Sequence, residues 1–199
     1  MIQDVNRLVD NINRILNLAK IESKSYEKEF TIVDLVPAIE QVYKNNIHLF
    51  PDCEINILNP ADRSLPYRIN PSLFEMLVMN LLSNAIKYNA SKPPKVDVTF
   101  ERHHRKLHIR FSDNGIGLEK PEIKKIFKKF YQVGHSDDMS ATGSGLGLYL
   151  VQTIARIHNG KVIADSMGSG KGSVFTLILP FRPELNWAEI KLKRDERER

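Results

Sequence analysis

Two asparagines and a lysine stand within one largely apolar stretch, "NLLSNAIKY", residues 80–88. If the stretch is helical, Asn80, Asn84 and Lys87 lie within about 60° of one another around the helix axis. Two carboxamide oxygens and a lysine on one stripe suit Mg²⁺ with phosphate, because hard cations prefer oxygen ligands and an ammonium group attracts an anion. The asparagines could instead bond to neighbouring backbone groups, so the stripe alone leaves both interpretations open.

A second set of candidate residues follows a predicted strand at "DNGIG", residues 113–117. Asp113 would end the strand, while Gly115 and Gly117 would let the backbone turn tightly and approach a ligand. Taken alone the pattern is weak, because Asp-Asn-Gly is also a common turn.

A third pattern, "GSGLGL", stands where a polar loop passes into a predicted helix. Free amides at a helix N-terminus attract phosphate. The spacing is not that of the dinucleotide-binding fingerprint, no strand precedes it, and the chain has no Walker motif. A nucleotide site made from these residues would therefore follow another design.

The composition fits one globular domain with a modest appendage. Of 199 residues, 42% are hydrophobic and 27% charged, and no apolar run approaches the roughly 20 residues that a membrane-spanning helix needs. Cys53 is the only cysteine, which excludes an internal disulfide and a cysteine-based zinc site and favours a reducing compartment. The net charge of +5 comes from basic residues interleaved with acidic ones, so nucleic acid is not an expected partner.

Residues 1–25 are predicted to form one amphipathic helix. Apolar residues recur there at alternating spacings of three and four, as along the seam of a coiled coil, and the stretch has no Gly or Pro. A helix this long needs a partner surface. It could pack on its own domain, but we favour pairing with another helix, in cis or from a second subunit.

The rest of the chain mixes strands and helices. Asp34 is the expected N-cap of one helix, and Asn70 that of a longer helix over residues 71–88. Further helices are predicted at residues 123–130 and in a segment that ends at Asn159. Strands are predicted at "EINIL", "KVDVTFER", "KLHIRFSD", "KVIADSM" and "SVFTLILP". Antiparallel strand pairs with three main helices predict a two-layer α/β sandwich whose helices cover one face of the sheet.

Five motifs occur in a fixed order: "NLLSNAIKY", "DNGIGL", "IFKKFYQ", "GSGLGL" and "GSGKGSVFTLILP". They closely resemble the N, G1, F, G2 and G3 boxes of sensor histidine kinases of two-component systems. The resemblance covers residues from about 1 to 182 and implies the Bergerat-type ATP-binding fold shared with gyrase, Hsp90 and MutL. It also implies three parts. These are the second helix of a dimerisation and phosphotransfer hairpin (1–25), a catalytic ATP-binding domain (26–182) and a charged tail or linker (183–199).

The resemblance implies ATP and Mg²⁺ as ligands and gives the polar residues their roles. Asn84 would coordinate Mg²⁺ with help from Asn80, and Lys87 would contact phosphate. Tyr88 would lie against adenine. Asp113 would accept a hydrogen bond from the adenine amino group, which distinguishes adenine from guanine.

Other residues are implied to surround the nucleotide. The stretch 132–142 would be a closing lid. Phe130, with Phe127 and Tyr131, resembles the aromatic residues that anchor this lid, although such aromatics are also common in cores. The residues implied to line the base pocket or hold the triphosphate are Gly115, Gly117, Gly143, Gly145, Leu146 and Gly147.

The chain departs from the family pattern in two places. Many relatives carry an arginine where Gln132 stands, so a cation for the γ-phosphate is missing unless Lys128, Lys129 or Lys171 replaces it. The His-Glu motif with a downstream Thr-Pro, which carries the phosphoacceptor, does not occur in the chain. The chain therefore resembles the C-terminal part of a kinase whose first hairpin helix is left out, and we expect no self-phosphorylation.

The expected function is the ATP- and Mg²⁺-binding catalytic domain of a sensor histidine kinase. It would transfer the γ-phosphate of ATP to a histidine on a helix absent from this chain. The resemblance implies a homodimer through the N-terminal helix, a response-regulator receiver domain as partner, a cytoplasmic location, and membrane attachment only through parts outside this chain.

Alternatives from other classes stay open. They are a serine kinase of the anti-sigma type and a degenerate ATP-binding module that acts by docking. A clamp ATPase like Hsp90 or MutL would need a catalytic carboxylate on the polar stripe. Glu75 lies about 140° from Asn80 around the helix, which is a poor place from which to activate water.

Overall fold

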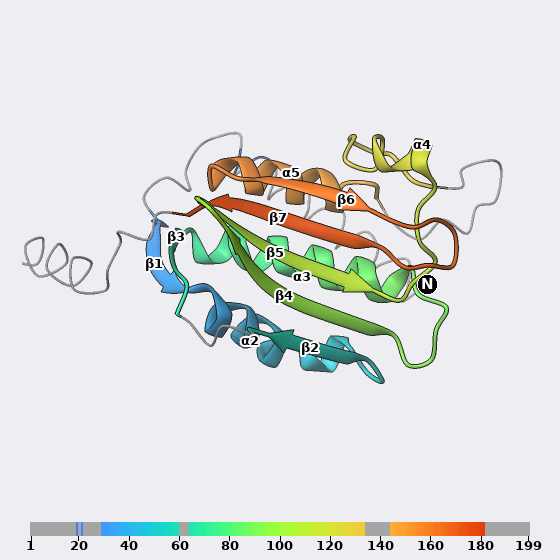
Figure 1. Cartoon of the computed structure of the whole chain (residues 1–199), viewed down its shortest axis with the longest axis horizontal. Coiled ribbons are helices and arrows are strands. Elements are labelled where there is room, and N and C mark those ends of the chain that lie inside the picture. Colours follow the sequence, from blue (N-terminus) through green and yellow to red (C-terminus); the bar gives the residue numbers. More distant parts are fainter. Residues whose placement is uncertain (1–18, 20, 22–28, 60–63, 134–143, 182–199) are drawn as a thin grey trace, which may run out of the picture.

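The computed structural model describes residues 19, 21, 29–59, 64–133 and 144–181 (Figure 1). The elements in chain order are β1 (Thr31–Asp34), α2 (Leu35–Asn45), the 3-10 helix η2 (Ile47–Leu49), β2 (Glu54–Leu58), β3 (Pro66–Ile69), α3 (Pro71–Lys87), β4 (Lys95–His103), β5 (Lys106–Asp113), α4 (Lys120–Ile123), α5 (Gly147–Ile157), β6 (Lys161–Asp165) and β7 (Val174–Pro180).

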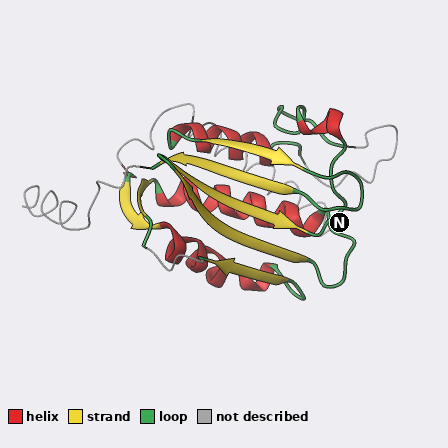
Figure 2. Cartoon of the chain, viewed as in Figure 1, coloured by secondary structure: helices red, strands yellow, loops and turns green. Residues whose placement is uncertain are grey.

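Five strands form one mixed sheet in the order β2-β4-β5-β7-β6. Neighbouring strands run antiparallel except β2 and β4, which pair in parallel. The helices α2, α3 and α5 cover one face of this sheet (Figures 1 and 2). The predicted two-layer α/β sandwich is therefore confirmed.

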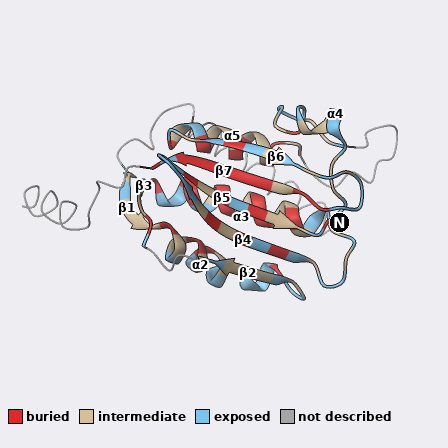
Figure 3. Cartoon of the chain, in the orientation of Figure 1, coloured by how far each residue is buried: buried red, intermediate tan, exposed pale blue. Residues whose placement is uncertain are grey.

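The hydrophobic core lies between the sheet and the helices. Alternate residues of β4 and β5 point into it, so buried Val98 pairs with Phe111 and buried Phe100 pairs with Ile109. Burial is concentrated along β7 and α3 (Figure 3). The buried residues of α3 are Leu73, Phe74, Leu77, Val78, Leu81, Leu82 and Ala85. Because each large side chain contributes about 1.5–3 kcal/mol when fully buried, this packing fixes α3 firmly on the sheet.

Two helices begin at the residues predicted to cap them. Asp34 Oδ1 accepts a hydrogen bond from Val36 N at 3.2 Å, and Asn70 Oδ1 accepts one from Leu73 N at 3.0 Å. Each bond satisfies an amide that the helix itself leaves without an acceptor. Since the start of α3 is fixed, the direction in which its polar stripe points is fixed too.

The short basic helix expected at residues 123–130 is wrong in position and length. The helix in this region is α4, which covers Lys120–Ile123 and accommodates Pro121 in its first turn. Beyond α4 the backbone forms tight turns, such as the one in which Lys128 N donates to Lys125 O at 2.8 Å.

The sequence did not indicate two features of strand pairing. Residues Pro66–Ile69 form β3, which pairs with β1 in a separate two-stranded sheet that sets Thr31 opposite Ile69. The parallel pairing of β2 with β4 was not predicted either. Both pairings join segments that are far apart in the chain, and local alternation carries no information about such partners.

Several predictions concern residues outside the described ranges. They are the helix of residues 1–25 except for Ala19 and Ile21, the lid over residues 134–142, Gly143, and the tail of residues 183–199. Ile21 is buried and belongs to the core. Within the described part of the chain, no helix combines the length and the apolar character needed to cross a membrane.

Candidate functional site

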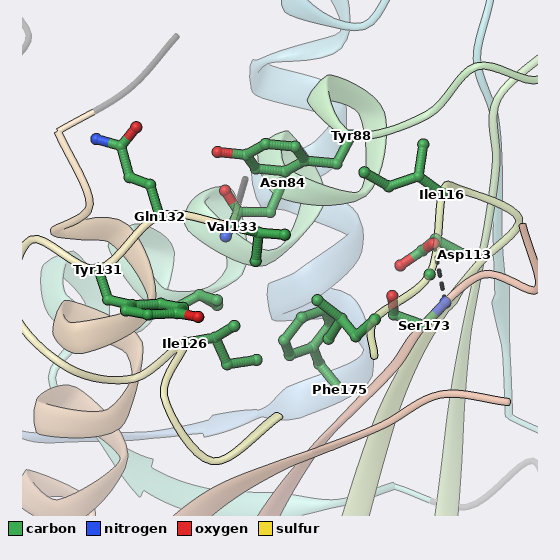
Figure 4. A pocket seen from close by; sticks show the side chains of 13 residues that line it. Asn84, Tyr88, Asp113, Ile116, Ile126, Tyr131, Gln132, Val133, Ser173 and Phe175 are labelled. Carbon is green, nitrogen blue, oxygen red and sulfur yellow. Dashed lines mark hydrogen bonds between the residues drawn. The ribbon is translucent and has the colours of Figure 1, made fainter. Parts of the chain in front are cut away.

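A cavity of about 90 Å³ opens at the edge of the sheet where β5 ends. Side chains from α3, from the end of β5 and from the segment after α4 converge on it (Figure 4). It is lined by Asn84, Tyr88, Asp113, Ile116, Gly117, Leu118, Ile126, Tyr131, Gln132, Val133, Leu148, Ser173 and Phe175. Apolar walls with a few polar groups are typical of a site for a small organic ligand.

Asp113 is held in a fixed orientation at this cavity. Its Oδ1 accepts hydrogen bonds from Gly115 N at 2.8 Å and Ser173 N at 3.1 Å. Burial raises the pKa of Asp113 above its usual value, and the bonds from Gly115 and Ser173 oppose this rise. Within the described part of the chain Oδ2 has no hydrogen bond, so this oxygen can accept one from a ligand.

Gly115 allows the chain to pass close to the end of α3. A Cβ atom at this position would lie 2.5 Å from Tyr88 O and 2.8 Å from Asp113 Oδ1. The approach is used by the next residue, since Ile116 N donates to Tyr88 O at 3.0 Å. Only glycine therefore permits the β5 end and the α3 end to form adjoining walls of the cavity.

The polar stripe of α3 reaches the cavity through Asn84. This residue is half-buried, and its carboxamide makes no hydrogen bond with any other described residue. Asn80, one turn earlier, does not line the cavity, and its Nδ2 donates to Met76 O at 2.8 Å. The backbone-bonding role that the sequence left open thus applies to the amino group of Asn80 and not to Asn84.

Lys87 and Tyr88 lie together at the end of α3. Lys87 Nζ donates to Tyr88 Oη at 3.3 Å and lies 4.9 Å from the centroid of its ring. Lys87 is exposed, whereas Tyr88, which is 44% exposed, turns one side to the cavity. A cation thus stands beside the cavity at the end of the helix that carries Asn84.

Among the described residues, no side chain caps the backbone amides at the start of α5. Gly147 is the first helical residue, and the N-cap residue Leu146 supplies no side-chain acceptor. The positive end of the helix dipole and these amides favour an anion. Nearby, the hydroxyl of Ser144 is buried and has no hydrogen-bond partner among the described residues. Leu148, in the first turn, lines the cavity.

Gly145 connects this helix start to the aromatic segment. Its φ is +66°, and a Cβ atom would lie 2.6 Å from the carbonyl carbon of Phe130. Phe130 N donates to Gly145 O at 3.0 Å. The phenyl ring of Phe130 is not part of the cavity, because the residue is 69% exposed and its neighbour Tyr131 lines the wall instead. Phe127 is half-buried against the core.

Gln132, which stands where the family pattern has an arginine, and the three lysines considered as replacements for that arginine lie in different surroundings. Gln132 lines the cavity. Lys129 places its Nζ 4.9 Å from the centroid of the Tyr149 ring, while Lys128 and Lys171 are exposed. Within the described part of the chain, none of these three lysines lines the cavity.

Sequence reasoning missed about half of the cavity wall. The missed residues are Ile116, Leu118, Ile126, Leu148, Ser173 and Phe175, whereas Val133 falls within the stretch predicted to be a lid. In a sequence, an apolar residue in a pocket wall looks like an apolar residue in the core. Ser173 acts through its backbone amide, which any residue except proline provides. Its position within "GSGKGSVFTLILP" was the only available signal.

Comparison with known proteins decides the family. The family model of histidine kinase-, DNA gyrase B- and HSP90-like ATPases matches residues 69–183, more than half of the chain. The chain belongs to this family. The matched range includes every residue that lines the cavity, so the cavity lies in the ATPase domain.

Curated relatives of this ATPase domain are sensor histidine kinases. The sensor histidine kinase WalK of Bacillus subtilis is 28% identical over 186 residues, which cover 91% of this chain and 30% of WalK. The sensor-like histidine kinase SenX3 of Mycolicibacterium smegmatis is 28% identical over 201 residues, which cover 100% of this chain and 51% of SenX3. The chain thus spans about a third to a half of the length of these relatives.

Solved structures share the fold of the domain. Full-length ShkA in complex with AMPPNP superposes with a TM-score of 0.73 at 21% identity, over 90% of this chain and 37% of ShkA. Together with the family match, this confirms the resemblance to histidine kinase ATP-binding domains and the Bergerat-type fold.

Proposed function

We propose that this ATPase domain binds ATP with Mg²⁺ and transfers the γ-phosphate to a histidine on a helix outside this chain, for signalling to a response regulator. The observation that carries the proposal is the pairing of two polar groups in one apolar cavity. Two amides hold one oxygen of Asp113. Among the described residues, neither the other oxygen nor the carboxamide of Asn84 has a hydrogen-bond partner.

The base-binding half of the proposal rests on Asp113. Its Oδ2 would accept a hydrogen bond from the amino group of adenine, and guanine presents a carbonyl oxygen at the same ring position. A buried acceptor that meets an acceptor is left unpaired, which is the basis of discrimination between the two bases. The apolar walls, including Ile116 and Phe175, suit the faces of a flat ring.

The phosphate-binding half rests on α3 and the start of α5. The carboxamide oxygens of Asn84 and Asn80 are donors that suit a hard cation, so they fit Mg²⁺, which would neutralise charge on the phosphates when bound. Because both ligands are neutral, the triphosphate itself would supply the opposite charge. Lys87 and the amides around Gly147 would contact the phosphate oxygens.

The transfer step needs positioning and charge neutralisation more than a base in this domain. A neutral imidazole is already a nucleophile, so the attacking histidine needs no base to activate it. Hydrolysis would need a carboxylate that activates water. Glu75 is the acidic residue of α3, but it is exposed. It accepts a hydrogen bond at 3.5 Å from Asn46, the C-cap residue of α2. We therefore expect slow hydrolysis of ATP.

The partners follow from the same proposal. The relatives are sensor kinases, so the N-terminal helix would join two copies in the full protein and a response-regulator receiver domain would take the phosphate. Membrane attachment would come from parts outside this chain. The degenerate docking module remains the second candidate, because Gln132 lines the cavity at the position where the resemblance to sensor kinases implies an arginine.

Calorimetric titration of the purified chain with ATP, ADP and GTP, with and without Mg²⁺, tests the binding. We expect ATP to bind more tightly than GTP and more tightly with Mg²⁺, and to release little free phosphate. The absence of saturable ATP binding would leave the docking module as the better explanation.

The transfer is tested in the full-length protein with ATP labelled at the γ-phosphate. We expect protein-bound label that survives base and is lost in acid, as a phosphohistidine is. Label that survives acid and is lost in base would instead support a serine kinase. Stable phosphohistidine on this chain alone would contradict transfer to a helix outside it.

A further inference from the structure

One hydroxyl group connects the turn after β5 to the turn between β6 and β7. Ser166 directly follows β6 and is half-buried. Its Oγ accepts hydrogen bonds from Leu118 N at 3.0 Å and Gly168 N at 3.2 Å, and it donates to Gly172 O at 2.7 Å. A serine hydroxyl has one donor and two acceptor positions, so the full capacity of this group is used.

The segments joined by Ser166 hold both walls beside Asp113. Leu118 lines the cavity. Gly172 N donates to Gly115 O at 3.0 Å. The next residue, Ser173, donates its amide to Asp113 Oδ1 at 3.1 Å. Gly172 O, which accepts the hydrogen bond from Ser166, is two covalent bonds from Ser173 N, the amide that orients the carboxylate. Ser166 itself does not line the cavity and is not among the site residues predicted from the sequence.

We propose that Ser166 is a positioning residue of the adenine pocket, acting through Leu118 and Gly172 to keep Ser173 and Asp113 in register. This inference rests on the proposed nucleotide-binding function. It assigns to Ser166 no contact with the nucleotide. A hydroxyl is required because a single atom must both accept from two amides and donate to a carbonyl, and alanine can do neither.

The Ser166→Ala variant tests the role. The change removes the hydrogen-bond partner of Leu118 N and Gly172 O. We expect the loss of these hydrogen bonds to weaken the affinity for ATP about five- to tenfold. Because the orientation of Asp113 is affected, the preference for ATP over GTP should fall as well. A change in overall stability alone would weaken both nucleotides equally.

Three further variants separate positioning from general damage. Ser166→Thr keeps the hydroxyl and should restore both affinity and preference. Ser166→Cys offers only a weak donor and acceptor and should shift both in the direction of alanine, which keeps the test valid if the alanine variant does not fold. Ser112→Ala is the matched control, because Ser112 adjoins Asp113 on β5 but its hydroxyl bonds to no described residue.

Amide hydrogen exchange without nucleotide gives a second, independent measurement. Faster exchange of Leu118 N and Ser173 N in Ser166→Ala, but not in Ser112→Ala, is the expected result. Unchanged exchange with an unchanged ATP-to-GTP ratio would overturn the role of Ser166. If the wild-type chain binds no ATP, the proposed function fails, and the exchange rates still decide whether Ser166 holds these segments.

Discussion

Asp113, the last residue of β5, and Ser173, which directly precedes the neighbouring strand β7, are joined by two hydrogen bonds. Asp113 N donates to Ser173 O at 2.9 Å, and Ser173 N donates to Asp113 Oδ1 at 3.1 Å. The backbone of Ser173 thus bonds to both the backbone and the side chain of Asp113 at the edge of the cavity. The direction of the carboxylate is set by the register of two strands, and this makes Asp113 a fixed acceptor.

Asp113→Asn should abolish the preference for adenine. The asparagine Oδ1 can still accept from Gly115 N and Ser173 N, which leaves its amino group where the free carboxylate oxygen stood. Two donors would then face each other when adenine binds. We expect ATP affinity to fall at least about tenfold, or about 1.4 kcal/mol, with a much smaller effect on GTP. Calorimetric titration with both nucleotides measures this.

Asp97→Asn is the control for that change in charge. Asp97 is exposed on β4 and accepts from Asn56 Nδ2 at 2.8 Å. ATP affinity should match the wild type. If Asp113→Asn kept the wild-type ratio of ATP to GTP affinity, Asp113 would not be the adenine acceptor.

Asn84→Ala should remove the dependence of ATP binding on Mg²⁺. Its carboxamide is the polar group of α3 that lines the cavity without a hydrogen bond to another described residue. Losing this oxygen ligand should bring the affinity with Mg²⁺ down toward the affinity measured in chelator. Titrating Mg²⁺ at fixed ATP gives the apparent metal affinity, and the exposed residue Asn56 provides Asn56→Ala as control. A wild-type Mg²⁺ response in Asn84→Ala would refute the metal assignment.

Gln132→Arg should increase the preference for ATP over ADP. Gln132 lines the cavity, and a guanidinium there can form charge-assisted hydrogen bonds with the terminal phosphate of ATP, which ADP lacks. The site is partly open to solvent, so we expect a gain of about two- to fivefold in the affinity ratio. The gain should shrink at high salt. Gln41→Arg on the exposed side of α2 adds the same charge away from the cavity and should leave the ratio unchanged.

His158 should make the unfolding midpoint depend on pH. Its Nδ1–H donates to Ile154 O at 2.8 Å, and its unprotonated Nε2 accepts from Asn70 N at 3.1 Å. Burial lowers the pKa of His158 below 6.5, partly opposed by the bond to Ile154. The unfolded chain therefore takes up the proton first. The stability that neutral His158 contributes is present above pH 6.5 and is lost as the pH falls through the lowered pKa of the folded state.

Thermal unfolding from pH 8 to pH 5 measures this loss. His158→Gln cannot titrate, so its midpoint should be lower at pH 8 but less dependent on pH. The exposed residue His48 supplies the control, and His48→Gln should keep the wild-type slope. Equal slopes in all three proteins would show that His158 is not responsible.

The sequence by itself determined the local structure of this protein. Asn70 followed by Pro71 marked the start of α3, and the helical period then placed Asn80 and Asn84 on one side of it. Alternating apolar residues identified β4 and β5, and the order of five motifs identified the family. Each signal is carried by residues close together in the chain, where backbone geometry and capping act directly.

Only the tertiary structure decided which of these residues form the site. Asp113 and Ser173 are 60 residues apart in the chain, and the register of β5 with β7 makes them partners. Packing puts Tyr131 in the cavity wall and leaves its neighbour Phe130 exposed. The same holds for Ser166, whose hydroxyl has meaning only because two turns from distant segments meet there. Such contacts depend on how the sheet is assembled and how helices pack on it, and local sequence preferences contain no information about either.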